Sequence, residues 1–248
     1  MTETSEPPIT QSPIAQSRAS VWEDFIDIFY APSQVFARRE HGNFWIPLIV
    51  VTVLSGALFY LNSGVLRPIF DAEFDRGMAA ALRENPKMPP EAIERMRSIG
   101  SIIGQVAMFV FMPVGIFGVA CAMWLAGKLV EAKQTFHAAL VVAAYSFAPR
   151  ILQFAINGFQ GLFLDPSQLD GQFRLSLGPG RFFDPDTTSP LLLAVIGRID
   201  VFTIWITVLV AIGLAVTGRI PFGSAAIAAV IVWIVGGLPA ILGALRSM

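Results

Sequence analysis

Charged side chains are scarce in this chain of 248 residues, and three long stretches contain none at all. Lys, Arg, Asp and Glu together make up 14% of the sequence, and hydrophobic residues make up 54%. A typical soluble domain is about 25% charged. Residues 41–66, 98–127 and 220–245 lack all four charged residue types. These runs exceed the roughly 20 apolar residues that a helix needs to cross a bilayer, so an ordinary soluble fold is excluded.

Other absences narrow the function. The net charge of −1 leaves no excess of basic residues, which excludes a strongly basic nucleic-acid binder. The single cysteine, Cys121, cannot form a disulfide within the chain. No basic and apolar leader stands at the start, because the first apolar run begins only near Phe44. We therefore expect the first span to be kept and to serve as the insertion signal.

Catalytic and ligand-binding motifs are also missing. The sequence contains no His-Glu-x-x-His, Gly-x-Ser-x-Gly, P-loop or dinucleotide-binding glycine pattern. The only two histidines, His41 and His137, are far apart in sequence, and two independent histidines at span entrances are favoured over a shared metal site. We therefore expect no catalytic, cofactor-binding or metal-binding residues, and no enzymatic activity.

The apolar runs predict an all-α, polytopic membrane protein with five transmembrane helices. Three runs are free of charge, and the other two are interrupted only by Arg150 in one and by Arg198 and Asp200 in the other. The predicted spans cover residues 44–66, 99–127, 135–163, 192–217 and 222–245. Short turns after the second and fourth spans predict two antiparallel hairpins. Small residues such as Gly115 and Gly118 are expected to let neighbouring helices approach closely.

A polar segment separates the first two spans and is expected to form two helices. The first covers Pro68 to Glu84. The second begins at Pro90, since proline is favoured in the first turn of a helix, and continues without a break into the second span.

The region ahead of the first span has two parts. Residues 1–19 are rich in Ser, Thr, Gln and Pro, and are expected to be a disordered tail. A single membrane domain is expected over residues 20–248. At its start, Ser20 and Glu23 have the spacing of a capping box, and Pro32 stops the helix that follows.

This first helix is predicted to be amphipathic and to lie at the membrane interface. Its apolar face has helical spacing, whereas Asp24 and its acidic neighbours lie elsewhere on the helix and make the polar face acidic. The apolar face consists of Trp22, Phe25, Ile26 and Phe29. An acidic polar face is unusual for a lipid binder, so packing of the apolar face on the protein's own helices is favoured. Lipid sensing is the alternative.

Three stretches carry a family resemblance. Residues 29–36 place an aromatic residue three positions before Pro32 and a phenylalanine four positions after it. Residues 127–149 contain Gly-Lys, then a Phe–x–x–Ala–Leu run, an Ala–Tyr pair and a proline, and residues 199–205 begin with Ile-Asp-Val-Phe. In this order, over about residues 22–245, they resemble the Yip1 family of five-span membrane proteins in the form found in bacteria.

The resemblance implies a cytoplasmic N-terminus and a location in the bacterial cytoplasmic membrane. We adopt this topology because the count of basic residues in the loops leaves the orientation open. Eukaryotic members of the family are linked to vesicle traffic and small GTPases, but no residue of this sequence indicates such a partner. For bacterial members the resemblance implies a fold more than a task.

Four residues form a candidate polar cluster inside the membrane: Arg150, Arg198, Asp200 and Tyr145. At 1.5 Å per residue, Arg150 lies about 22 Å along the third span and Asp200 about 27 Å from the inner end of the fourth. Both would lie in the outer half of the bilayer, where an unpaired charge is costly. We therefore expect a salt bridge between Arg150 and Asp200. The alternative is that each side chain reaches the headgroups separately.

These features predict a non-enzymatic membrane scaffold or adaptor. It would act through contacts with membrane lipids or with an unidentified membrane protein, and would not bind nucleic acid. The alternative is a small transporter or channel with a polar site near Arg150 and Asp200. A transporter needs a polar cavity at mid-depth, whereas a scaffold is expected to have a dry core.

Overall fold

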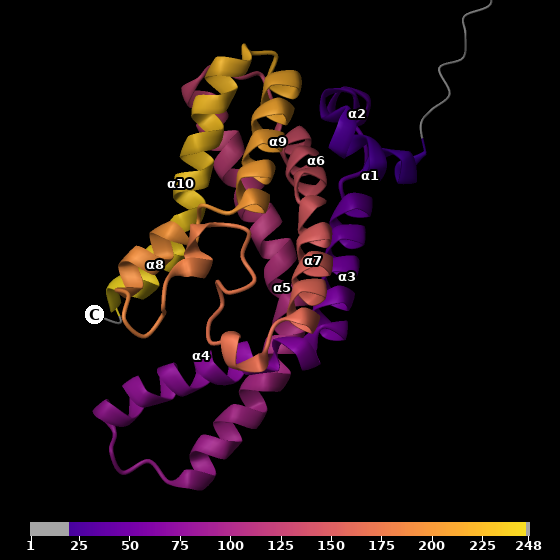
Figure 1. Cartoon of the computed structure of the whole chain (residues 1–248). Coiled ribbons are helices and arrows are strands. Elements are labelled where there is room, and N and C mark those ends of the chain that lie inside the picture. The colour runs from indigo at the N-terminus through magenta and orange to yellow at the C-terminus, as the bar shows by residue number, and fades with distance from the viewer. Residues whose placement is uncertain (1–19, 247–248) are drawn as a thin grey trace, which may run out of the picture.

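A computed structural model describes residues 20–246, which form a bundle of helices without strands (Figure 1). The tail expected to be disordered, residues 1–19, lies outside the described residues.

Four helical segments of the described chain are long and apolar enough to cross a membrane on their own. They are α5 (Pro90–Leu129), the consecutive helices α6 (Phe136–Ser146) and α7 (Pro149–Phe163), α9 (Val201–Gly218) and α10 (Phe222–Arg246). A fifth span results if α3 (Trp45–Leu61) and α4 (Ser63–Glu84) are taken together across a bend of 81°.

The outer faces of these helices are apolar. Val106, Val110 and Val114 are more than half exposed on α5, as are Ile227 and Ile234 on α10. A soluble monomer rarely exposes apolar surface of this extent. Lipid solvates such a surface, and each helix satisfies its own backbone hydrogen bonds. The chain is therefore an integral membrane protein.

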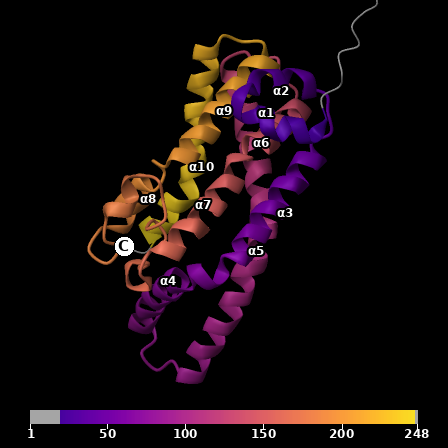
Figure 2. The same cartoon turned by 45° about the vertical axis from the view of Figure 1, so that its right-hand side comes forward.

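The helix expected at the start of the domain is present as α1 (Val21–Tyr30), followed by α2 (Pro32–Arg39). Its capping box is reciprocal: the Ser20 N–H donates to the Glu23 carboxylate at 2.7 Å, and the Glu23 N–H donates to the Ser20 hydroxyl at 3.2 Å. Figures 1 and 2 show α1 and α2 at the end of the bundle where α3 begins, opposite to α4.

The first predicted span, residues 44–66, ends earlier than expected. α3 stops at Leu61, and α4 begins immediately after the turn at Asn62 rather than at Pro68. The Asn62 side chain donates a hydrogen bond to the Phe154 carbonyl oxygen of α7 at 2.9 Å, which secures the corner. The partner lies 92 positions away in sequence, so no local pattern predicts the bend.

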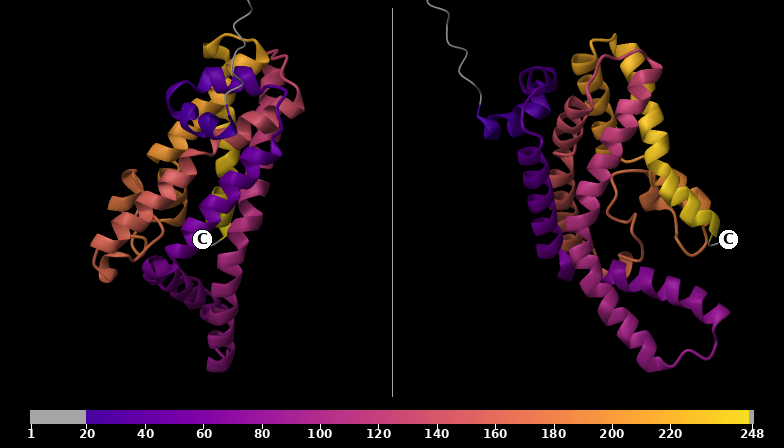
Figure 3. Two further views of the ribbon diagram at one scale, coloured as in Figure 1. Left: turned by 90° about the vertical axis from the view of Figure 1, so that its right-hand side faces the viewer. Right: turned by 180° about the vertical axis from the view of Figure 1, so that it is seen from behind.

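The helix expected from Pro90 is confirmed, because α5 continues unbroken for 40 residues through the second span. Its first turns project from the bundle together with α4 (Figure 3). Arg97 links the two helices, with its guanidinium 2.5 Å from the Asp75 carboxylate and 3.2 Å from that of Asp71.

The third predicted span, residues 135–163, has the expected limits but is broken in the middle. α6 ends at Ser146 and α7 begins at Pro149. Proline has no N–H, so Pro149 cannot donate to the carbonyl of Tyr145. The Ala148 N–H takes this acceptor instead at 3.0 Å, in a tighter turn.

The fourth predicted span, residues 192–217, is wrong in its first part. After a loop that contains η1 (Pro166–Gln168) and η2 (Pro179–Phe182), the chain forms the short helix α8 (Pro190–Ile196). It leaves the helical path at Gly197, and α9 begins only after Asp200. The break arises because the Asp200 carboxylate caps α9, accepting the Phe202 N–H at 2.9 Å. The fifth predicted span matches α10.

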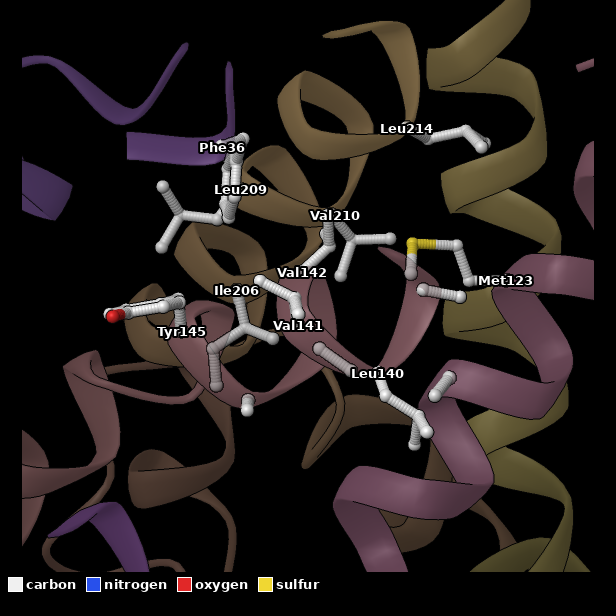
Figure 4. Packing of buried hydrophobic residues seen from close by; sticks show 14 of the residues in the cluster. Phe36, Met123, Leu140, Val141, Val142, Tyr145, Ile206, Leu209, Val210 and Leu214 are labelled. Carbon is white, nitrogen blue, oxygen red and sulfur yellow. The ribbon is translucent and has the colours of Figure 1, made fainter. Parts of the chain in front are cut away.

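The centre of the bundle is α6. Every residue from Ala138 to Ser146 is buried, and α6 packs against α3, α5 and α9. Figure 4 shows Val141, Val142 and Tyr145 of α6 among the apolar side chains that α9 contributes to this core. Alanines make up much of the buried stretch, and small side chains allow neighbouring helices to come close.

The contact between α6 and α9 depends on Gly213. A Cβ at this position would lie 2.2 Å from Val142 Cγ1 and 3.2 Å from Phe36 Cε2. Val142 is fully buried and β-branched, so it has no alternative rotamer to move into.

We predict that Gly213→Ala lowers the free energy of unfolding by roughly 1–3 kcal/mol, because it overpacks this contact. Thermal unfolding in detergent measures the loss. Gly77→Ala on α4 is the control, since its Cβ would meet nothing within 4 Å and alanine favours the helix. Equal losses in the two variants would contradict the prediction.

Candidate functional site

Asp24 of α1 has no exposed surface and is bound by three side chains from two other helices. Its carboxylate accepts hydrogen bonds from Arg38 at 2.6 Å, Arg39 at 2.5 Å and the Tyr145 hydroxyl at 3.2 Å. Arg38 also pairs with Asp27 at 2.5 Å. Burial opposes the charge of Arg38, but the bonds to Asp27 and Asp24 outweigh it and raise the pKa of its guanidinium. This cluster joins α1, α2 and α6.

The expected position of Asp24 on the polar outer face of the helix is wrong. Together with Ile28, one turn later, Asp24 forms the buried face of α1. Because Asp24 was expected outside, Arg38 and Arg39 were not identified as its partners. The only local signal was a pair of basic residues in the last turn of the next short helix.

The four residues of the predicted apolar face of α1 divide into two pairs. Phe25 and Phe29 turn inward, where the Phe25 ring lies 5.5 Å from that of Tyr145. Trp22 and Ile26 are 67% and 59% exposed, and Tyr30 continues their line at 81%. We call Trp22, Ile26 and Tyr30 the α1 ridge. The helix thus packs on the protein with one face and presents an apolar ridge outward.

The structure brings Arg150, Arg198 and Asp200 of the predicted polar cluster near one another, without a direct bond between them, and places Tyr145 elsewhere. Tyr145 belongs to the Asp24 cluster described above. Asp200 is buried and fully engaged: besides capping α9, it accepts the Ser176 hydroxyl at 2.7 Å and the Leu177 N–H at 2.9 Å. It therefore anchors the loop between α7 and α8 to the start of α9.

The predicted ion pair between Arg150 and Asp200 does not form within residues 20–246, although the Asp200 charge is close enough to favour the charged form of Arg150. Arg150 donates to the Gln153 side chain at 2.5 Å. The break before α9 places Asp200 at a helix N-terminus, where backbone N–H groups and Ser176 take its oxygens. Local capping therefore prevails over the long-range charge pair.

Arg198 lies against the middle of α10. Its guanidinium donates to the Trp233 carbonyl oxygen at 2.7 Å and sits 5.6 Å from the centre of the Trp233 ring. Gly237 makes room for it, because a Cβ there would lie 3.2 Å from Arg198 Nε. Arg150 and Arg198 both line a cavity of about 360 Å³ between α5, α9 and α10.

The loop between α7 and α8 is also held to α4. The Gln172 N–H donates to the Glu73 carboxylate at 3.0 Å. Within the loop, the hydrogen bond from Arg174 is the main reason that the pKa of Asp170 lies below its ordinary value.

The structure brings His137 next to the segment that carries His41. His137 donates through Nε2 to the Gly42 carbonyl oxygen at 2.8 Å. In the described part of the chain, no group of three or more His, Cys, Asp or Glu side chains is placed to hold a metal ion.

Most of the chain matches a known protein family. The Yip1 domain matches residues 26–243, from the middle of α1 almost to the end of α10. The chain belongs to the Yip1 domain family. No curated protein and no solved structure matches it. The resemblance to the Yip1 family is therefore confirmed. The matched range includes Arg38, Arg39 and Tyr145 as well as the Arg150–Arg198 cavity, whereas Asp24 itself lies two residues before it.

We predict that Asp24→Ala lowers the stability of this Yip1 domain by roughly 2–4 kcal/mol, because it removes the buried carboxylate that binds Arg38, Arg39 and Tyr145 together. Breaking a fully buried ion pair would cost more stability, but the side chains of Arg38 and Arg39 are 28% and 25% exposed, so solvent screens part of their charge. Thermal unfolding in detergent measures the change.

Asp27→Ala is the matched control for Asp24→Ala. It removes a carboxylate on the same helix from the same Arg38, but the Asp27 side chain is 36% exposed. Its loss is expected to stay below about 1 kcal/mol. A similar loss in both variants would show that burial of Asp24 is not what matters.

A second prediction concerns the loop anchor of the Yip1 domain. Asp200→Asn leaves one acceptor oxygen in place of two, so the side chain can no longer accept from Phe202 on one side and from Ser176 and Leu177 on the other, which is expected to cost roughly 1–3 kcal/mol. The loop between α7 and α8 should then be cleaved faster by protease than in the unmodified protein. Asp184→Asn, on an exposed side chain of the same loop, should leave the cleavage rate unchanged. Unchanged cleavage in Asp200→Asn would contradict the anchoring role.

Proposed function

We propose that this protein is a non-enzymatic membrane scaffold or adaptor that acts through protein or lipid contacts of the α1 ridge. We further propose that it lies in the cytoplasmic membrane of a bacterium with its N-terminus in the cytoplasm, as the family resemblance implies. In that orientation α1 and α2 lie at the cytoplasmic face of the membrane.

The observation that carries this proposal is an exposed apolar ridge on a helix that is held in place. An isolated amphipathic helix would lose conformational freedom when it binds a membrane or a protein, and this loss would weaken its binding. The Asp24 cluster already fixes α1 on α2 and α6, so the ridge is presented in one orientation. A rigid surface of Trp and Ile side chains, exposed next to a membrane, is suited to contact lipid or another protein.

Transport of a small anion is the second candidate function. The cavity beside Arg150 and Arg198 favours it, because two cations line a space within the bundle. Against it, the Asp200 carboxylate is committed to the loop and to α9, and the buried core around α6 is apolar. The scaffold role is therefore the preferred function.

Site-specific photocrosslinking in native membranes tests the proposal. We predict that a benzophenone side chain introduced at Trp22 or Ile26 gives one discrete adduct, either with lipid or with a membrane protein. The control position is Phe182, which is 80% exposed in the loop between α7 and α8. It is aromatic and equally accessible, but lies away from the α1 ridge.

Two outcomes would contradict the scaffold role. One is that positions 22 and 26 give no more adduct than position 182. The other is that the protein in sealed vesicles carries an anion flux that Arg150→Gln abolishes, which would establish the transport alternative.

A further inference from the structure

The cavity between α5, α9 and α10 has the features of a ligand site rather than of a packing defect. Its volume of about 360 Å³ falls within the range of about 300–1,000 Å³ typical of ligand pockets. Most of its lining is apolar, as at Val210, with a small number of polar groups. Such a lining suits a ligand that is largely hydrocarbon with one polar end.

The cavity opens along α5. Gly115 and Gly118 were expected to be points of close helix approach, but a Cβ at either position would meet nothing within 4 Å. Both glycines are exposed and line the cavity. Because α5 is a candidate membrane span with an apolar outer face, this opening faces the lipid rather than the water at either end of the bundle.

The arginine charges lie at membrane depth. Trp233, whose carbonyl binds Arg198, is eleven residues after the start of α10. At 1.5 Å per residue this is about 17 Å along α10. Arg198 itself stands three residues before α9, whose 18 residues span about 27 Å, close to the thickness of the bilayer core, so its guanidinium reaches from near the headgroup level into the core. Cationic side chains in this region are costly and are normally paired.

Neither arginine is paired with a carboxylate in the described residues. Each guanidinium has five N–H groups, and Arg150 uses its Nη1 for Gln153 while Arg198 uses its Nη2 for the Trp233 carbonyl. Arg198 Nε is buried without a hydrogen-bond partner. The nearby carboxylate of Asp200 has its oxygens occupied by three other donors. Both guanidinium groups therefore keep N–H donors that no carboxylate takes, and both arginines line one cavity, which an anionic group would complete.

We propose that this cavity binds an anionic phospholipid. The headgroup phosphate accepts hydrogen bonds from Arg150 and Arg198, and one acyl chain lies in the apolar part of the cavity beside Gly118 and Val210. A free phosphate ion has the same binding chemistry at the arginines, but it would leave the apolar lining and the opening toward lipid unused. This site is separate from the α1 ridge, so it does not depend on the scaffold role.

Native mass spectrometry of the full chain in detergent tests the proposal. The probes are phosphatidylglycerol, phosphatidylcholine with identical acyl chains, and inorganic phosphate as a competitor. We expect phosphatidylglycerol to bind with the lower Kd. Arg150→Gln and Arg198→Gln should each raise this Kd about tenfold or more, since each removes a charge-assisted contact.

Gly118→Leu keeps the test decisive if an arginine variant fails to fold. Its side chain enters open space and favours the helix, so the fold is retained while the acyl-chain space is filled. Gly118→Leu should also raise the Kd for phosphatidylglycerol about tenfold, because its side chain occupies the space that the acyl chain would fill. Two variants away from the cavity are the controls. Gly77→Leu adds a side chain at another glycine with open space around it, and Arg67→Gln removes an arginine whose side chain is 81% exposed. Both should bind phosphatidylglycerol as the unmodified protein does.

Three results would overturn the proposal. Equal Kd values for the two lipids would show that the arginines do not select an anionic headgroup. Unchanged binding in Gly118→Leu would place the lipid elsewhere. Complete displacement of phosphatidylglycerol by millimolar inorganic phosphate would identify a site for the free ion. None of these results depends on crosslinking at the α1 ridge, so this proposal and the scaffold role fail separately.

Discussion

The buried carboxylate of Asp24 is the interaction on which the arrangement of the first two helices depends. A charge without exposed surface is tolerated only when its oxygens are hydrogen-bonded and its charge is balanced. Arg38, Arg39 and Tyr145 meet both needs, and they come from α2 and α6. The cluster thereby sets the rotation of α1 about its own axis. That rotation turns Phe25 and Phe29 inward and leaves Trp22 and Ile26 outside.

A second constraint comes from the charges that lie deeper in the bundle. The helices break beside these charges, once before Pro149, which has no N–H to donate, and once between Gly197 and Asp200, where Asp200 caps α9. At the second break the Phe202 N–H at the start of α9 and two donors of the α7–α8 loop satisfy the Asp200 carboxylate. In the described chain Arg150 and Arg198 then have only neutral hydrogen-bond partners. This is why their cavity, and not the predicted charge pair, is the polar feature of the membrane region.

Most of the fold could be predicted because membrane spans follow from a simple physical requirement. A segment without charge and longer than about 20 residues has few stable locations other than a bilayer. This placed α5, α6 with α7, and α10 close to their observed limits. The same argument gave wrong span limits at Asn62 and at Asp200. At each place a polar side chain bonds to a residue far away in sequence, such as Phe154 for Asn62, and a local pattern does not show such a partner. The sequence identified Tyr145, Arg150 and Asp200 as candidate residues, but it did not predict which groups each of them bonds.

The sequence by itself determined that the chain is an all-helical membrane protein of the Yip1 type, with a capped helix ahead of the first span. These properties depend on composition and on local spacing, which a linear sequence displays directly. Only the tertiary structure decided that Asp24 is inside, that Trp22 and Ile26 are outside, and that Arg150 shares a cavity with Arg198 instead of a bond with Asp200. The physical reason is that a polar group bonds to whichever partner the packed helices bring within reach, and that choice is made in three dimensions.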